Sequence, residues 1–189
     1  MPRPNYRDKI IVTARELFDQ RGIHATGIDL IIAQTGIARM TLYNHCASKE
    51  ALVSAVLDRD ITGARAYLGN LVCQPGKSPE ERLELIFGAL ERAMQGPQFF
   101  GCLFIKAAAE YSDEDHMIHK AALEYKAIYR DALRQLVNEM NIVADETLTA
   151  QLFLLFEGAL VTAQVDSKYR NVHDALEAAR ILVQFHKRA

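Results

Sequence analysis

Apolar residues recur along this chain three or four positions apart, which is the spacing of an amphipathic α-helix. In the first such stretch, about residues 7–21, Ile10, Ala14 and Phe18 fall on one helical face, and Gly22 follows where a helix is expected to end. No segment alternates apolar and polar residues beside a turn signal, as a β-strand would. The pattern therefore predicts an all-α fold of about nine helices.

Capping and turn residues divide the chain into these helices. Ser78-Pro79-Glu80-Glu81 is the clearest start signal, because it combines a capping box with proline at the first helical position. Gln74-Pro75-Gly76 and Gly96-Pro97 separate neighbouring helices. The expected helices cover about residues 7–21, 27–36, 39–45, 49–73, 79–95, 99–111 and 112–140, with two more from about residues 145 and 171.

Length and composition indicate a protein with a substantial core. The 189 residues are 50% hydrophobic, so the fold needs no disulfide or metal support. Three cysteines without a C-x-x-C spacing suit a reducing compartment. The N-terminus lacks the apolar segment of a signal peptide, and the longest apolar run, Leu152–Val165, is interrupted by Glu157 and is short for a bilayer. We therefore expect a cytoplasmic protein that does not contact a membrane.

Charge is distributed unevenly along the chain. Residues 1–49 contain seven Lys or Arg and four Asp or Glu, a net charge of +3. The other 140 residues contain 15 basic and 20 acidic side chains, a net charge of −5. This distribution predicts a basic N-terminal head on an acidic body, and a basic head is compatible with nucleic-acid binding.

Residues 26–46 have the pattern of a helix-turn-helix. Gly36-Ile37-Ala38 joins two short helices, where glycine supplies a positive φ and Ile37 fills the angle between them. Ile28, Ile31 and Leu42 complete a small core, which leaves the polar residues of the second helix exposed. Arginine can bond guanine, asparagine can bond adenine, and methionine or threonine can contact a thymine methyl group. The candidate base-reading residues are Arg39, Met40, Thr41 and Asn44.

Over about residues 7–60, the chain resembles the TetR/AcrR family of transcriptional regulators. Ile32 stands where the family has a small residue, and Cys46 stands where it has an aromatic residue. The positions that carry the resemblance are Ala14, Leu17-Phe18, Gly22, Thr26, Ile31, Gly36-Ile37, Thr41-Leu42-Tyr43-Asn44-His45 and Ser48-Lys49-Glu50-Ala51-Leu52.

The resemblance implies a DNA-binding domain at residues 1–47, with its helix-turn-helix at about 27–46, and an effector-binding and dimerisation domain at residues 48–189. It further implies contacts to the DNA backbone from Thr26, Tyr43, His45 and Lys49. The complete set of expected DNA-binding residues is Thr26, Gly27, Ala38, Arg39, Met40, Thr41, Tyr43, Asn44, His45 and Lys49.

The C-terminal portion is expected to bind a second copy of the chain and a small-molecule effector. The helix from about residue 145 is apolar around its circumference and needs cover on both sides, which predicts a homodimer through about residues 146–187. The alternative is a central helix in a monomeric bundle. Candidate effector-binding residues, any of which could instead be plain core, are Tyr67, Phe99, Phe104, Met117, Tyr125, Phe153 and Glu157.

No residue is assigned a catalytic or metal-binding role. The common nucleotide-binding, metalloprotease and nucleophile-elbow motifs do not occur, and no third ligand accompanies His116 and His119. We predict a dimeric repressor that binds a near-palindromic double-stranded DNA site, is released by an effector, uses no cofactor and is not an enzyme. The alternative is an all-α ligand-binding or catalytic bundle whose helix-turn-helix does not read DNA.

Overall fold

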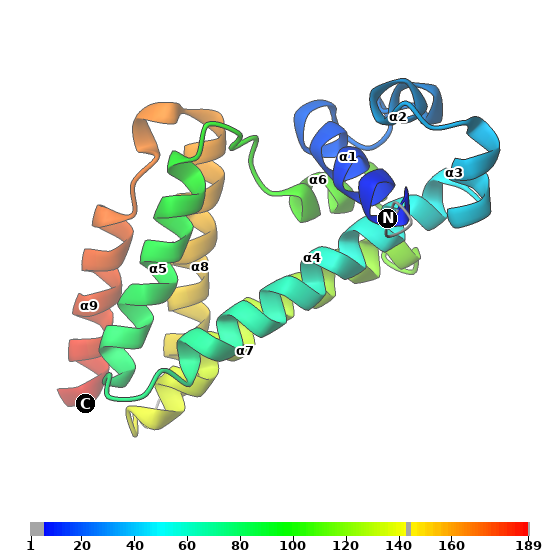
Figure 1. The fold of residues 1–189 in the computed structure, drawn as a ribbon. Helices are drawn as coiled ribbons and strands as arrows, with labels where there is room; N and C mark the ends of the chain where they lie inside the picture. The colour runs from blue at the N-terminus through cyan, green and yellow to red at the C-terminus, as the bar shows by residue number, and fades with distance from the viewer. Residues whose placement is uncertain (1–5, 143–144, 189) are drawn as a thin grey trace. The chain divides into compact units, whose positions relative to one another are not determined.

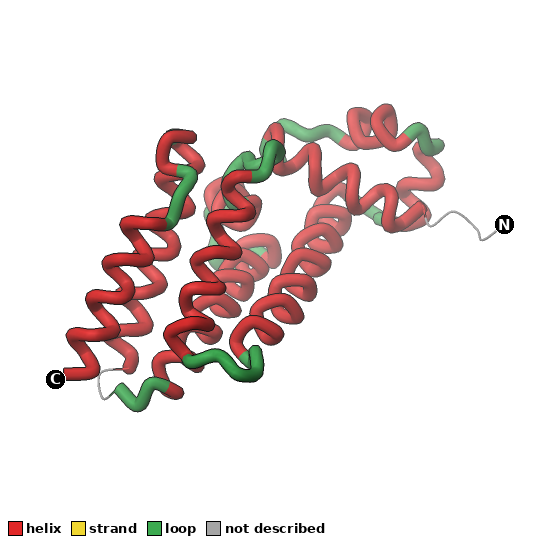
Figure 2. Tube along the Cα trace, turned by 60° about the vertical axis from the view of Figure 1, so that its left-hand side comes forward, coloured by secondary structure: helices red, strands yellow, loops and turns green. Residues whose placement is uncertain are grey.

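The computed structural model describes residues 6–142 and 145–188, and every regular element in these residues is helical (Figures 1 and 2). The all-α prediction is confirmed, with nine α-helices and one short 3-10 helix in the described part of the chain. The elements are α1 (Tyr6–Arg21), α2 (Ile28–Thr35), α3 (Arg39–His45), α4 (Lys49–Val72), α5 (Pro79–Gln95), α6 (Leu103–Glu110), α7 (Met117–Glu139), α8 (Asp145–Val165), η1 (Ser167–Tyr169) and α9 (His173–Arg188).

Two predicted helix starts are wrong. α6 begins at Leu103, several residues later than expected, because the preceding segment contains Gly101 with a φ of 94°. α7 begins at Met117, and the acidic residues before it form a turn in which Asp113 accepts a hydrogen bond from the backbone N–H of Asp115 (2.9 Å). In both cases, local turn chemistry delays the start of the helix beyond the residue at which it was expected.

The chain divides into two compact units. The first comprises Met1–Gly63 and Cys102–Tyr125, and the second comprises Ala64–Gly101 and Lys126–Ala189. The chain passes from one unit to the other within α4 and within α7. As a result, α6 belongs to the same unit as α1, α2 and α3, although much of the second unit lies between them in the sequence.

In the first unit, the core forms around the apolar face of α1. Ile10 and Phe18 on α1 are fully buried, as are Ile31 on α2 and Leu42 on α3. α1 contacts both α2 and α3. The stripe predicted from the sequence is therefore the surface against which the two shorter helices pack.

In the second unit, α8 packs against α5, α9 and η1, and α5 also contacts α9. Phe156 of α8 meets Phe87 of α5 edge-on, with their ring centroids 5.8 Å apart. The predicted start of α5 is confirmed as a reciprocal capping box between Ser78 and Glu81, with N···O distances of 3.2 and 2.7 Å. These contacts define a helical bundle of α5, α8 and α9.

α8 is only partly covered by its own chain. Leu152 and Phe156 are buried, whereas Leu154, Val161 and Val165 are 69%, 43% and 84% exposed. The helix that contains the apolar run Leu152–Val165 is longer than the run itself and begins at Asp145. By length and composition alone, Glu146–Val165 could span a bilayer, although a helix that packs inside a soluble protein passes the same test.

The turn glycine of the helix-turn-helix provides a test of backbone strain. Gly36 has a φ of 67°, and Gly63, which lies inside α4, serves as the control. A Cβ atom added at either position would meet nothing within 4 Å, so neither substitution causes a steric clash. We expect Gly36→Ala to lower the free energy of unfolding by about 1 kcal/mol, because alanine disfavours positive φ. The matched Gly63→Ala should raise it by about 0.5–1 kcal/mol, because alanine favours the helix. Urea unfolding of both variants measures the difference, and equal effects would contradict this explanation.

Candidate nucleic-acid interface

The turn between α2 and α3 is built from backbone and hydroxyl hydrogen bonds. Gly36 ends α2 in the left-handed conformation, and its N–H donates to the carbonyl of Ile32 (2.9 Å). The buried hydroxyl of Thr35 donates to the carbonyl of Ile31 (2.8 Å). These bonds satisfy backbone groups at the end of α2 and set the direction in which α3 starts.

The two departures from the family pattern fit into this small core. Cys46 is 5% exposed and follows α3 directly, so its thiol is part of this core. Burial raises the pKa of the Cys46 thiol, which keeps it protonated and unreactive at neutral pH. Ile32 is half-buried, and the turn hydrogen bond from Gly36 forms on its carbonyl.

Most of the predicted DNA-binding residues lie together on α3 and face solvent. Met40 is 71% exposed and Tyr43 is 40% exposed, and Thr41 is half-buried. A large, exposed methionine on a short helix is unusual unless another molecule covers it. The other exposed members of the set on or beside α2 and α3 are Gly27, Ala38, Arg39, Asn44 and His45.

Two of the predicted backbone-contact residues are placed differently. Thr26 is fully buried, and its hydroxyl lies 2.7 Å from the carbonyl of Gly22 and 3.2 Å from that of Leu17. Its side chain therefore closes the end of α1 and is not exposed to solvent. Lys49 is half-buried at the start of α4 and donates to the carbonyl of His24 (3.1 Å).

Sequence reasoning missed an acidic partner of Arg39. Asp29, in the first turn of α2, forms an ion pair with a terminal guanidinium nitrogen of Arg39. Both side chains are exposed, at 77% and 59% respectively. An Asp ten residues before an Arg is not a helical spacing, so only the geometry of the turn brings them together.

The loop after α1 is held by a carboxylate from α6. Glu110 accepts hydrogen bonds from the backbone N–H groups of Ile23 (2.9 Å) and His24. A Cβ atom on Gly22 would lie 2.9 Å from this carboxylate, which is too close. Gly22 also has a φ of 88°, so both the space and the backbone conformation require glycine at this position. Glu110 is 86 residues from His24 in the sequence, and no local signal marks it.

Charged side chains also connect α1 to α4 and α6. Arg15 donates to Asp60 of α4 (2.9 Å) and to Asp19 (3.1 Å), and the ammonium group of Lys106 on α6 donates to the carbonyl of Asp19. The side chain of Asp19 is 10% exposed, and one of its oxygens has no hydrogen-bond partner. Burial raises the pKa of Asp19, opposed by the nearby Arg15 and Lys106.

The predicted effector-binding residues are divided between the two units. In the first unit, Phe104 is buried and its ring stacks on Tyr125 at 3.7 Å, whereas Met117 is exposed. In the second unit, Tyr67 is exposed and Phe99 lies under the guanidinium of Arg170.

Glu157, also in the second unit, has a cationic partner that the sequence did not suggest. Both of its oxygens accept from the ammonium group of Lys126 on α7, at 2.8 and 2.6 Å, and each side chain is about 20% exposed. Phe153, one turn earlier on α8, is half-buried. A carboxylate in an otherwise apolar helix needs water, a partner or a ligand, and Lys126 of the same chain is its partner here.

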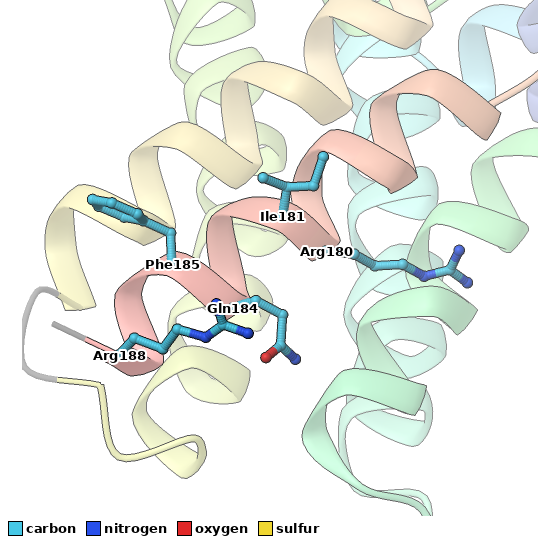
Figure 3. Close-up of a pocket in the computed structure, with 5 residues that line it drawn as sticks. All are labelled: Arg180, Ile181, Gln184, Phe185 and Arg188. Atoms are coloured by element: carbon cyan, nitrogen blue, oxygen red, sulfur yellow. The ribbon is translucent and has the colours of Figure 1, made fainter.

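A shallow groove of about 390 Å³ lies on α9 and includes none of the predicted effector-binding residues. Ile181 and Phe185 point to one side of the helix in Figure 3 and are 63% and 65% exposed. The remaining lining residues are Arg180, Gln184 and Arg188.

The histidines considered as metal ligands are used in local structure. His119 Nδ1 lies 2.7 Å from the carbonyl of Tyr111, and His116 Nδ1 accepts from the N–H of Ile118 (3.2 Å). Within residues 6–142 and 145–188, no three His, Cys, Asp or Glu residues gather as a metal site would require.

These features define a class of protein, namely an all-helical protein with an N-terminal helix-turn-helix. Residues 10–56 match the family model described as bacterial regulatory proteins, tetR family. The chain is 24% identical over 181 residues to the HTH-type transcriptional regulator YjdC of Escherichia coli K12, covering 92% of this chain and 95% of that protein. It is 39% identical over 61 residues to the transcriptional activator FasR of Mycolicibacterium smegmatis. This match covers 32% of this chain and 28% of FasR.

Solved structures agree with these sequence matches. SCO4454, a TetR-family transcriptional regulator from Streptomyces coelicolor, superposes with a TM-score of 0.89 at 26% identity, covering 96% of this chain and 95% of that one. The reduced form of NemR from Escherichia coli has the same fold, with a TM-score of 0.82 at 20% identity. The superposition covers 92% of this chain and 94% of the NemR chain. Residues 10–56 therefore form a DNA-binding domain of the tetR family, and the chain as a whole has the fold of TetR-family transcriptional regulators.

The buried carboxyl of Asp19 leads to a prediction about pH. Because the folded chain holds the pKa of Asp19 above its unfolded value, folding favours the protonated form of this group. Its contribution to stability is fully present below the unfolded pKa and is lost as the pH rises through the folded pKa. Asp19→Asn cannot ionise, so the free energy of unfolding of the variant, relative to the original chain, should rise between pH 4 and pH 7.

Urea unfolding at several pH values checks this trend. Glu16→Gln, at an exposed position on α1, is the control because it removes the same charge without a buried carboxyl. A pH-independent difference between Asp19→Asn and the original chain would show that burial does not control this group.

Proposed function

We propose that this chain is a repressor that binds a near-palindromic double-stranded DNA site as a homodimer and leaves it when a small molecule binds. The observation that carries the proposal is α3, a seven-residue helix whose polar side chains face solvent while Leu42 anchors it in the core. A helix of this width fits the major groove, where base edges carry a readable pattern of donors and acceptors.

The roles proposed at the DNA follow from side-chain chemistry and exposure. Arg39, Met40, Thr41 and Asn44 read base edges, because they offer bidentate donors, methyl groups and an amide. Gly27, Ala38, Tyr43, His45 and Lys49 contact the sugar–phosphate backbone. Thr26 acts indirectly, because its hydroxyl holds the end of α1 from which α2 departs.

The dimer interface is proposed on α8 and α9, within residues 146–187. Leu154, Gly158, Val161 and Val165 are spaced as one face of α8, and all four are exposed. A Cβ atom added at Gly158 would meet nothing within 4 Å, so another helix can approach closely there. Exposed apolar residues in a continuous stripe are expected at a subunit interface.

The effector is proposed to bind among the apolar side chains of residues 48–189, with residues 1–47 contacting DNA. The candidates remain Tyr67, Phe99, Phe104, Met117, Tyr125, Phe153 and Glu157, to which the structure adds Lys126 as the ion-pair partner of Glu157. A ligand that prefers the DNA-incompetent state shifts the population away from DNA, and a coupling of about 1–3 kcal/mol suffices. By linkage, DNA then weakens binding of that ligand by the same factor.

The same proposal sets where and how the protein works. It acts in the cytoplasm, where it reaches DNA, and it requires neither a cofactor nor catalytic residues. The family match supports regulation over the alternative of a catalytic or ligand-binding bundle that does not read DNA.

Selection on random double-stranded DNA tests the proposal. We expect the purified protein to enrich an inverted repeat with half-sites separated by about one or two helical turns, because each subunit presents one α3 to the major groove. Enrichment of no sequence at low salt by a folded dimer would overturn the proposal.

Two variants measured on the enriched site separate base reading from backbone binding. Arg39→Ala should weaken specific binding by about 1–3 kcal/mol and relax the preference at one base position. Lys49→Ala should weaken binding to all sequences alike and reduce the salt dependence. Titration curves for Arg39→Ala that match those of the original chain would remove Arg39 from the base-reading set.

The dimer proposal predicts that Leu154→Arg makes the protein monomeric, because a charge in the apolar stripe of α8 must stay hydrated. Leu123→Arg, at a 55% exposed leucine on α7, is the matched control and should remain dimeric. Light scattering coupled to size-exclusion chromatography measures the mass of each. A dimeric Leu154→Arg protein would place the interface elsewhere.

A further inference from the structure

Arg39 does not stand alone on the exposed surface of the helix-turn-helix. Its guanidinium is paired with the Asp29 carboxylate through one terminal nitrogen. Asp29 is exposed, and it brings a negative charge into a part of the chain whose first 49 residues carry a net charge of +3. A carboxylate beside DNA phosphates weakens binding to every sequence, so it opposes the general affinity of this surface.

The pairing leaves Arg39 able to read a base. Guanidinium carries five N–H donors in a rigid fork, and a guanine edge needs two of them. Asp29 engages one terminal nitrogen and leaves the rest of the fork available. An arginine held in this way loses less rotamer freedom when it bonds guanine than a mobile one does. The same carboxylate also competes with a phosphate for the guanidinium.

We propose that Asp29 is a specificity-determining residue that acts through Arg39. It orients the guanidinium toward a guanine edge and hinders its use as a nonspecific phosphate contact. Asp29 therefore raises the ratio of specific to nonspecific DNA affinity. This inference rests on the proposed DNA-binding function and adds a residue to it.

If Asp29 contributed only to folding stability, its substitution would have different effects. An ion pair this exposed contributes little to folding. Asp29 also lies in the first turn of α2, where a negative charge interacts favourably with the helix dipole. A residue that serves only that purpose changes the stability of the head and leaves base preference unaltered.

The test measures binding of the 189-residue chain to the selected site and to a scrambled duplex, for the original chain and for Asp29→Asn. We expect the specific-to-nonspecific ratio to fall about two- to tenfold in Asp29→Asn, through both weaker specific and stronger nonspecific binding. The salt dependence of nonspecific binding should steepen, because one repelling charge is removed. Glu16→Gln on α1 removes the same net charge away from Arg39 and should leave the ratio unchanged.

Selection on random DNA with each variant measures base preference, which a purely structural role of Asp29 would not change. Asp29→Asn should relax the same base position that Arg39→Ala relaxes, and Asp29→Glu should restore part of the preference. In the Arg39→Ala background, Asp29→Asn should have no further effect on base preference. Thermal unfolding confirms that each variant is folded.

The outcomes distinguish this inference from the function on which it rests. If the original chain enriches a site but Asp29→Asn shows the same base preference and affinity ratio, Asp29 is not a specificity determinant and the proposed function stands. An effect equal to that of Glu16→Gln would show a net-charge effect only and would also overturn the inference. If the original chain itself enriches no site, both the function and the inference fail.

Discussion

The surface that we propose to face DNA depends on the buried face of α1. α2 has eight residues and α3 has seven, and helices this short do not persist in water without tertiary contacts. Both pack on α1, where Ile10 and Phe18 are completely buried. The direction in which α3 presents its polar side chains is therefore set by apolar packing behind it and by the left-handed turn at Gly36.

Polar contacts then connect this head to helices that come later in the chain. Glu110 of α6 holds the loop after α1, and Asp60 of α4 pairs with Arg15. The compact unit that contains the head consequently includes α6 and the first half of α4, and it does not coincide with a functional division at residue 47. The partly buried carboxylate of Glu110 would lose two backbone N–H partners if α6 moved, so a shift of α6 disturbs the loop after α1. The link is local and electrostatic, and it lies within the first unit.

The second unit presents the opposite situation, in which apolar groups remain uncovered. α8 buries one face against α5 and α9 and exposes Leu154, Val161 and Val165 on another. The charge that interrupts the apolar run, Glu157, is neutralised by Lys126 inside the unit. With its carboxylate paired and its outer face apolar, α8 fits the subunit interface that we propose.

The sequence alone determined the positions of most helices, the turn at Gly36, the capping box at Ser78 and the exposure of Arg39, Met40 and Asn44, because helical periodicity and turn chemistry are local properties. Tertiary structure alone decided which partners the polar side chains find outside their own helix. Thr26 turns inward, Glu110 reaches a loop far away in the sequence, and Asp29 meets Arg39 across a turn. These pairings depend on how helices pack and how loops close, and residue spacing within one helix contains no information about either.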